Sequence, residues 1–227
     1  METHFQQELN HLKKELLKMA GLAEQAIANA IDSLVKRDSA LAERTIREDK
    51  AINEMELAID DLSLKLLALH QPMAADLRFI TSAMRINIEL ERIGDLAVNI
   101  AERALSLNQE LQLKPYIDIP RMAEITKNMV KTVLDAFVAG DPDLARAVCE
   151  RDDQVDDLND QVFRELLSYM LADPKTITRA VHLIIVSKYL ERIADHATNI
   201  AEDVIYMVQA KTVKHHPEML KENGNNA

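Results

Sequence analysis

The sequence is poor in the residues that make turns, disulfides and aromatic cores. Among its 227 residues there are four glycines, six prolines, one cysteine and no tryptophan, and aromatic residues account for 4%. Turn-forming residues are therefore scarce. Leu, Ala, Ile, Met, Glu and Lys predominate, and these are strong helix formers or adaptable core residues. The composition predicts an all-α protein.

Two further absences bear on the compartment. Cys149 is the single cysteine, so an intramolecular disulfide framework is excluded and a reducing environment is favoured. No apolar run approaches the roughly eighteen uncharged residues of a membrane span, and the first residues lack the hydrophobic segment of a secretory signal. We therefore expect a cytoplasmic location.

Positive charge is also in short supply. The chain has 38 acidic and 27 basic residues, a formal net charge of −11. Non-specific nucleic-acid binding needs dense Lys and Arg, so no nucleic-acid partner is expected. An acidic protein is repelled by anionic lipid, and we expect contact with a membrane only through protein partners.

Breaks in the helical pattern are few. Asp38 or Ser39 is expected to cap a helix, and Asp141 is expected to cap another with Pro142 as its first residue. Short connections between long amphipathic helices imply antiparallel packing in a bundle. The pattern predicts six helical segments, at about 2–36, 39–70, 73–108, 119–139, 141–172 and 174–211.

All six segments show apolar residues spaced three or four apart, and the second and third illustrate the stripe. The predicted core positions of the second segment are Ile52, Met55, Ile59, Leu62, Leu66 and Leu69. Those of the third segment are Ile86, Leu90, Ile93, Ala97, Ile100 and Ala104.

The six segments are two sets of three. The stretch "ERIGDLAVNIAE" begins at Glu91, and "ERIADHATNIAE", identical at nine of twelve positions, begins at Glu191. Similarly, "DSALAERTIREDKAINEME" aligns with "DPDLARAVCERDDQVDDLN". An internal repeat of this length predicts two tandem, pseudo-symmetric three-helix bundles. We place the first repeat at 1–114, the second at 115–213 and a flexible tail at 214–227.

Each repeat carries rows of oxygen-bearing side chains along two helices. At about 100° per residue, the members of a row fall within an arc of roughly 60–80°. Like charges four residues apart destabilise a helix, whereas carboxylate and amide oxygens suit a hard cation, or Fe, Mn or Zn. The rows comprise Asp49, Asn53, Glu56 and Asp60; Glu91, Asp95, Asn99 and Glu102; Asp152, Asp156 and Asn159; and Glu191, Asp195, Asn199 and Glu202. Phe163 stands where Asp60 would be repeated.

The rows also have a simpler interpretation. The apolar stripe lies nearly opposite the acids, so the rows can be a solvated face, with Arg92 and Arg192 as ion-pair partners. His196 has no counterpart in the first repeat and is expected at the surface. A carboxylate–metal enzyme, either a phosphohydrolase or an iron oxidase, is an alternative. However, there is no P-loop or nucleophile motif, and Gly94 and Ala194 stand where di-iron helices carry histidine. The residues favour a non-enzyme.

Taken together, these patterns resemble the PhoU family. The resemblance covers about residues 9–213 and rests on "DLRFITSAMRINIELERIGDLAVNIAE", "ITRAVHLIIVSKYLERIADHATNIAEDVIYMV" and "REDKAINEMELAID". It implies a cytoplasmic negative regulator of phosphate uptake and of the phosphate regulon. Such a protein is an adaptor between the ATPase subunit of the high-affinity ABC phosphate transporter and a sensor histidine kinase. An accessory protein of a transporter outside phosphate control is the other reading.

The resemblance also implies a homodimer and, as in some members, a multinuclear iron or zinc site. The positions that match the family's metal motifs are Glu91, Asp95, Asn99, Asp49, Asn53 and Glu56 in the first repeat, and Glu191, Asp195, Asn199, Asp152 and Asp156 in the second. Because Phe163 departs from this pattern, the second site is expected to be built differently from the first.

Overall fold

The protein is described here by a computed structural model covering residues 4–213. The predicted flexible tail, 214–227, lies outside the described residues. Within them the structure has six long α-helices and no strand. The helices are α1 (His4–Val35), α2 (Ser39–His70), α3 (Ala75–Asn108), α4 (Asp118–Ala139), α5 (Pro142–Ala172) and α6 (Ile177–Gln209), with a short 3₁₀ helix at Pro174–Thr176 before α6. The predicted segments are confirmed to within a few residues at their ends.

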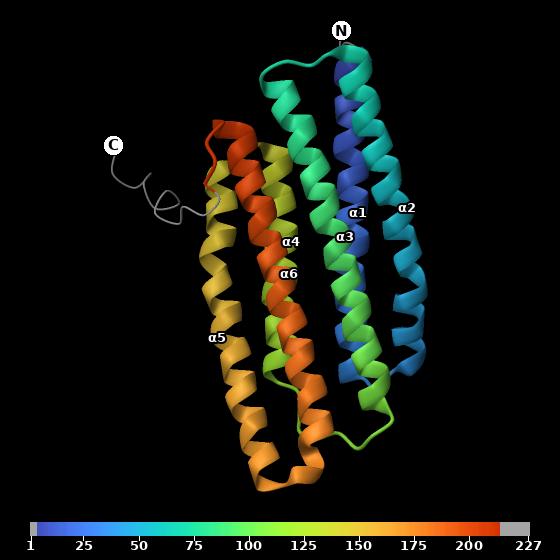
Figure 1. Cartoon of the computed structure of the whole chain (residues 1–227), viewed down its shortest axis with the longest axis vertical. Coiled ribbons are helices and arrows are strands. Elements are labelled where there is room, and N and C mark those ends of the chain that lie inside the picture. Colours follow the sequence, from blue (N-terminus) through green and yellow to red (C-terminus); the bar gives the residue numbers. More distant parts are fainter. Residues whose placement is uncertain (1–3, 214–227) are drawn as a thin grey trace, which may run out of the picture.

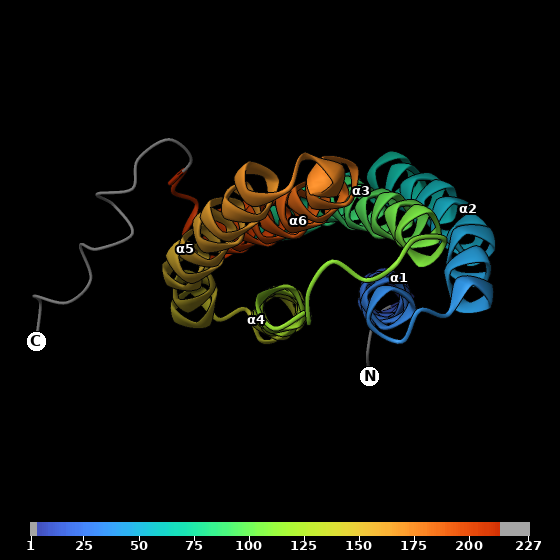
Figure 2. The same cartoon turned by 90° about the horizontal axis from the view of Figure 1, so that it is seen from below.

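The helices form two layers. Viewed end-on, α5, α6, α3 and α2 make one curved layer, and α1 and α4 lie on its concave side (Figure 2). Each three-helix set packs on itself, and α3 and α6 run antiparallel to each other at the centre, where the two sets meet (Figure 1). The all-α prediction of two pseudo-symmetric three-helix bundles is confirmed.

The predicted apolar stripes form much of the core. All six stripe residues of α3 are buried. On α2, Ile52, Ile59 and Leu66 are buried, and Met55 and Leu62 are half-buried at the edge of the core. Leu69 was wrongly placed in the core, since its side chain is 73% exposed. In the last turn of α2, His70 rather than Leu69 contacts α1, through Phe5 and Glu8.

Helix starts follow the expected chemistry. The Asp38 carboxylate accepts a hydrogen bond from the Leu41 N–H at 2.9 Å. Asp141 accepts from the N–H groups of the second and third helical residues, with Pro142 at the first position. A capping carboxylate satisfies N–H groups that have no partner inside the helix, and its charge opposes the positive helix end. These contacts explain why α2 and α5 begin at equivalent places in the two repeats.

The connection between the repeats is tied to both of them. Lys114 in this connection is buried, and its ammonium forms an ion pair with Glu165 of α5. Arg37, which follows α1, donates to the carbonyls of Asn108 and Glu110. A buried ammonium requires a counter-charge, so these contacts hold the linking segment against both three-helix sets.

Candidate functional site: two acidic clusters

The first acidic cluster lies where α2 packs against α3. It consists of Asp49 and Glu56 on α2 with Glu91 and Asp95 on α3, and their negative charges act on one another. Asp95 is exposed and the other three are half-buried. Asn53 donates a hydrogen bond to Asp49, so five of the six side chains predicted for this repeat are brought together by the pairing of two helices.

The negative charges of this cluster outweigh the positive charge near it, which comes from Arg92. Burial, and then the charges of Asp95, Glu56 and Asp49, raise the pKa of Glu91 above its usual value. Burial and Asp95 also raise the pKa of Asp49, partly opposed by the hydrogen bond that Asn53 donates to its Oδ2 at 2.9 Å. The other oxygen, Asp49 Oδ1, is buried and has no hydrogen-bond partner. Unpaired carboxylates of this kind favour a bound cation or a bound proton.

A glycine sets the spacing between these two helices. A Cβ atom on Gly94 would lie 2.9 Å from Ile52 Cδ1 and 3.3 Å from Asp49 Oδ1. The absence of a side chain at Gly94 therefore lets α2 approach α3 closely enough for Asp49 to be enclosed. The second repeat has Ala194 at this position and the smaller Val155 in place of Ile52.

The second acidic cluster lies where α5 packs against α6. It consists of Asp152 and Asp156 on α5 with Glu191 and Asp195 on α6. Burial, followed by the charges of Asp156 and Asp195, raises the pKa of Asp152 to about 7. Its Oδ1 is buried and accepts no hydrogen bond. Burial and neighbouring acids also raise the pKa values of Asp156 and Asp195.

The second cluster contains a lysine that the sequence analysis missed. Lys188, one turn before Glu191 on α6, forms an ion pair with Glu191 Oε2. The Lys188 charge also opposes the upward pKa shifts of Asp156 and Asp195. The signal was present in the repeat alignment, because the equivalent residue in the first repeat is Ile88.

The predicted asparagines Asn99 and Asn199, one turn after Asp95 and Asp195, lie toward the α3–α6 interface. Asn199 donates to Glu89 of α3 at 3.1 Å, and His196 Nδ1 lies 2.6 Å from the same carboxylate. His196 was wrongly expected at the surface, since only 12% of its side chain is exposed. Asn99 lines a cavity of about 220 Å³ at this interface, beside His196 and Arg92. Glu89 and His196 thus link the repeats.

The donor atoms of both clusters are of the kinds that bind a metal ion, but the side chains are not arranged around one. All donors are carboxylate or amide oxygens, which suit hard cations and carboxylate-bound iron, manganese or zinc. The buried Oδ1 atoms of Asp49 and Asp152 have no hydrogen-bond partner, and a bound cation would satisfy them. As the side chains lie, however, no three His, Cys, Asp or Glu residues between 4 and 213 stand close enough together to hold an ion. Side chains would have to rotate inward to do so.

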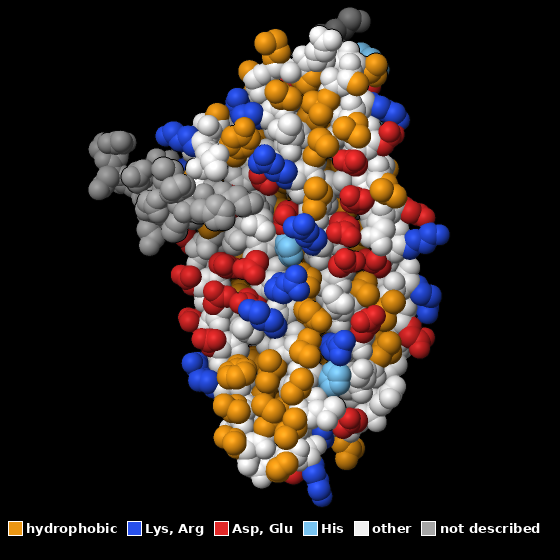
Figure 3. All heavy atoms as spheres, in the orientation of Figure 1, with side chains coloured by type: hydrophobic (Ala, Val, Ile, Leu, Met, Phe, Trp, Pro, Cys, Tyr) orange, Lys and Arg blue, Asp and Glu red, His pale blue; other side chains and the backbone are white. Residues whose placement is uncertain are grey.

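Figure 3 shows the outer face of the layer formed by α5, α6, α3 and α2. In Figure 3 the acidic side chains gather across the middle of this face, with basic side chains among them, and apolar side chains cover the lower ends of α5 and α6. The α5–α6 apolar patch is defined by five large exposed side chains: Phe163, Leu167, Leu171, Ile177 and Val181. Phe163, the departure noted in the repeat, is part of this patch rather than of the second acidic cluster.

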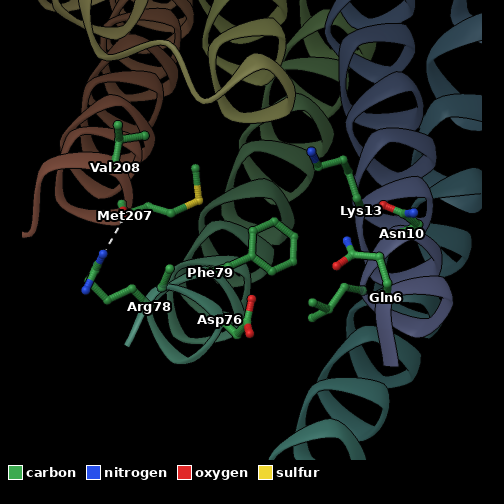
Figure 4. Close-up of a pocket in the computed structure, with 10 residues that line it drawn as sticks. Gln6, Asn10, Lys13, Asp76, Arg78, Phe79, Met207 and Val208 are labelled. Atoms are coloured by element: carbon green, nitrogen blue, oxygen red, sulfur yellow. Dashed lines mark hydrogen bonds between the residues drawn. The ribbon is translucent and has the colours of Figure 1, made fainter. Parts of the chain in front are cut away.

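A separate cavity of about 330 Å³ lies between α1, α3 and α6 (Figure 4). Lys13 at its edge donates to the carbonyl of Val138, in the last turn of α4, at 2.9 Å. Arg78 donates to the carbonyl of Met207 at 3.2 Å, and the Lys13 ammonium lies 5.8 Å from the centre of the Phe79 ring. The two hydrogen bonds join one repeat to the other, whereas the Lys13–Phe79 contact lies within the first repeat. This cavity is therefore bounded by residues that stabilise the junction of the repeats.

No helix among residues 4–213 is long and apolar enough to cross a membrane. Residues 4–213 thus form a duplicated three-helix protein, with one acidic cluster per repeat and a cavity of about 330 Å³ at the junction of the repeats. This arrangement defines a class of duplicated helical-bundle proteins.

Comparison with known proteins gives the family. The sequence model of the PhoU domain matches twice, at residues 16–104 and 119–204. The chain belongs to the PhoU family.

Its relatives match nearly end to end. It is 45% identical over 217 residues to the "Phosphate-specific transport system accessory protein PhoU homolog" of Aquifex aeolicus, covering 96% of this chain and 97% of the relative. The protein of the same description from Caulobacter vibrioides is 42% identical over 197 residues, covering 86% of each.

Solved structures agree with the fold. The crystal structure of PhoU from Pseudomonas aeruginosa superposes with a TM-score of 0.88 at 41% identity, over 92% of this chain and all of that one. The phosphate transport system regulatory protein PhoU from Streptococcus pneumoniae gives a TM-score of 0.85 at 28% identity, over 92% of this chain and 99% of that one.

Proposed function

We propose that this protein is an accessory protein of a phosphate-specific transport system and a negative regulator of phosphate uptake. The observation that carries this proposal is the match of both repeats to proteins described as phosphate-specific transport system accessory proteins. The finer proposal is an adaptor at the cytoplasmic face. It contacts the transporter's ATPase subunit and a sensor histidine kinase, and favours the inhibitory state of the kinase when phosphate is plentiful.

The shape of the molecule supports an adaptor. Its helices present long, continuous outer faces (Figure 1), and the α5–α6 apolar patch exposes five large apolar side chains next to the charged belt (Figure 3). Contiguous exposed apolar surface is typical of protein-contact sites. An adaptor that binds the transporter in one state and the kinase in another shifts the kinase equilibrium through the difference in its affinities.

We assign the acids to binding rather than to catalysis. The thiol of Cys149 is no nucleophile, since burial and nearby acids raise its pKa to about 12. Asp49, Asn53, Glu56, Glu91 and Asp95 would hold an iron or zinc ion in the first repeat. In the second repeat the ligands would be Asp152, Asp156, Glu191 and Asp195. Asn99 and Asn199 lie one helical turn beyond Asp95 and Asp195 and would complete the two sets. When bound, the metal would supply positive charge that removes the repulsion among the carboxylates.

The adaptor proposal is tested in cells. Deletion of the gene is expected to raise the output of the phosphate regulon in phosphate-rich medium, and unchanged output would contradict the proposed regulation. Affinity capture from phosphate-replete cells, read by mass spectrometry, is expected to recover the transporter ATPase subunit and the sensor kinase.

Two variants make the capture experiment more specific. Leu167→Asp with Val181→Asp places charge in the α5–α6 apolar patch, and it is expected to lose one of the two partners. Lys50→Asp, at an exposed position on α2, serves as the surface-charge control and is expected to keep both. Full capture of both partners by the patch variant would show that this patch is not the docking surface.

The enzyme alternative is tested on the purified protein. Phosphoester turnover, and oxygen consumption with ferrous iron, are compared between the unaltered protein and Asp95→Ala/Asp195→Ala. We expect no turnover in either protein. An activity that is present in the unaltered protein and lost in the double variant would show that the clusters are catalytic. The oligomeric state, proposed to be a dimer, is read by light scattering.

A further inference from the structure

The two acidic clusters differ in one residue that has a direct electrostatic effect. Lys188 forms an ion pair with Glu191 at the second cluster. The residue one hundred positions earlier, Ile88, has no charge and is 44% exposed. In the first cluster Asp49 is contacted by the neutral amide of Asn53. The Arg92 charge acts on Glu91 but is paired with Glu89. Its counterpart Arg192 acts on Asp195 in the second cluster, so the arginines do not distinguish the two clusters. Only the second cluster therefore contains an ammonium of its own.

The position of Lys188 places it in competition with an external cation. Glu191 is 16% exposed, whereas the Lys188 side chain is 57% exposed and reaches the cluster from solvent. Glu191 Oε2 is itself buried, and the Lys188 ammonium is the cation paired with it. A metal that bound Glu191 would have to displace this ammonium or share the carboxylate with it, because like charges at close range repel.

We propose that Lys188 is a built-in counter-cation of the second acidic cluster, which weakens metal binding there, while the first cluster is open to a metal ion. This inference rests on the metal-binding part of the proposed function. It makes the two repeats chemically unequal despite their matched carboxylates. The first cluster would respond to the supply of metal, and the second would be held together by the protein's own lysine.

The test is an exchange of the two residues. Lys188→Ile gives the second cluster the residue of the first, and Ile88→Lys does the reverse. Manganese(II) is the probe, because it prefers oxygen ligands and its free ion is counted directly by electron paramagnetic resonance. Lys127→Ile is the matched control, since Lys127 forms a comparable i, i+3 pair with Glu124 on α4, away from both clusters.

The expected changes are opposite in sign. Lys188→Ile tightens one manganese site by roughly tenfold, because an ammonium within contact distance repels the ion but can partly swing into solvent. Adding Asp152→Asn to this variant abolishes that gain, which assigns it to the second cluster. Ile88→Lys weakens manganese binding at the first cluster by roughly tenfold. Asp49→Asn abolishes binding at that cluster and so identifies the affected site. Lys127→Ile leaves both constants unchanged.

Thermal unfolding without metal gives a second, independent measurement. Lys188→Ile is expected to lower the Tm in chelator and to regain it with manganese, whereas Ile88→Lys raises the Tm in chelator. The proposal is overturned if both exchanges leave the manganese dissociation constants within twofold of those of the unaltered protein. It is also overturned if Lys127→Ile has the same effect as Lys188→Ile. A third refuting result is that no variant binds manganese at about 1 mM, which is the weak end of protein cation sites. These outcomes leave the regulon and capture experiments unaffected, so failure here is distinguishable from failure of the adaptor function.

Discussion

Replacing Asp152 by asparagine should stabilise the metal-free protein. Asp152 is half-buried among other acids, and its pKa is raised from 3.8 to about 7. The folded state therefore binds this proton more tightly than the unfolded state, and the aspartate costs stability as pH rises from about 3.8 to about 7. Asparagine has nearly the same shape and no charge, so Asp152→Asn removes that cost.

The size of the effect follows from the gap between the two pKa values. A gap of about three corresponds to about 4 kcal/mol at pH 8. Because Asp152 is partly exposed, solvent screening reduces this to roughly 2 kcal/mol. For a chain of this length, that is an increase in Tm of roughly 4–8 °C.

The assay is urea unfolding with chelator present at pH 4 and at several values from 7 to 9, which avoids the sequence pI of about 5.1. The gain of Asp152→Asn should be small at pH 4 and level above pH 7. Asp49→Asn, the equivalent change in the first repeat, is the matched control and should give a smaller gain. Added manganese should reduce the difference between the variant and the unaltered protein. A variant that is equally stable or less stable at pH 8 would refute the reasoning, as would a gain that does not depend on pH.

Three further changes test the packing and the links between the repeats. Gly94→Ala should destabilise the protein by about 1 kcal/mol, because overpacking against Ile52 outweighs the gain in helix propensity; adding Ile52→Val, the pairing found in the second repeat, should restore most of the loss in urea unfolding. Glu165→Ala leaves the buried Lys114 ammonium unpaired and should cost about 3–5 kcal/mol, measured by the same method, whereas a loss below 1 kcal/mol would show that the ammonium reaches water. Burial raises the pKa of Glu89, but the hydrogen bonds and charges around it outweigh burial and bring the pKa below 4.5; Glu89→Gln should therefore destabilise the protein by about 1–3 kcal/mol at pH 7, with the difference fading as pH falls below about 4.5, and a loss independent of pH would contradict this.

Local rules were sufficient for the helices. Asp38 and Asp141 mark helix starts because a short carboxylate satisfies free N–H groups wherever it occurs. The stripe of α3 is buried because residues three and four apart share a face. The duplication followed from the repeated "ER…D…NIAE" stretch alone. Leu69 shows the limit of this reasoning, since periodicity does not report which residue of a last turn the neighbouring helix contacts.

The sequence by itself determined the six helices, the two repeats and the rows of acids, because helical geometry places residues on a face without any knowledge of the neighbours. Only the tertiary structure decided which rows meet, because contacts between helices depend on side chains far apart in the chain. It joined Asp49 to Asp95 beside Gly94, turned Asn199 and His196 toward Glu89, and brought the Lys188 ammonium to the second cluster. Matched sequences therefore became two acidic clusters with different charge environments.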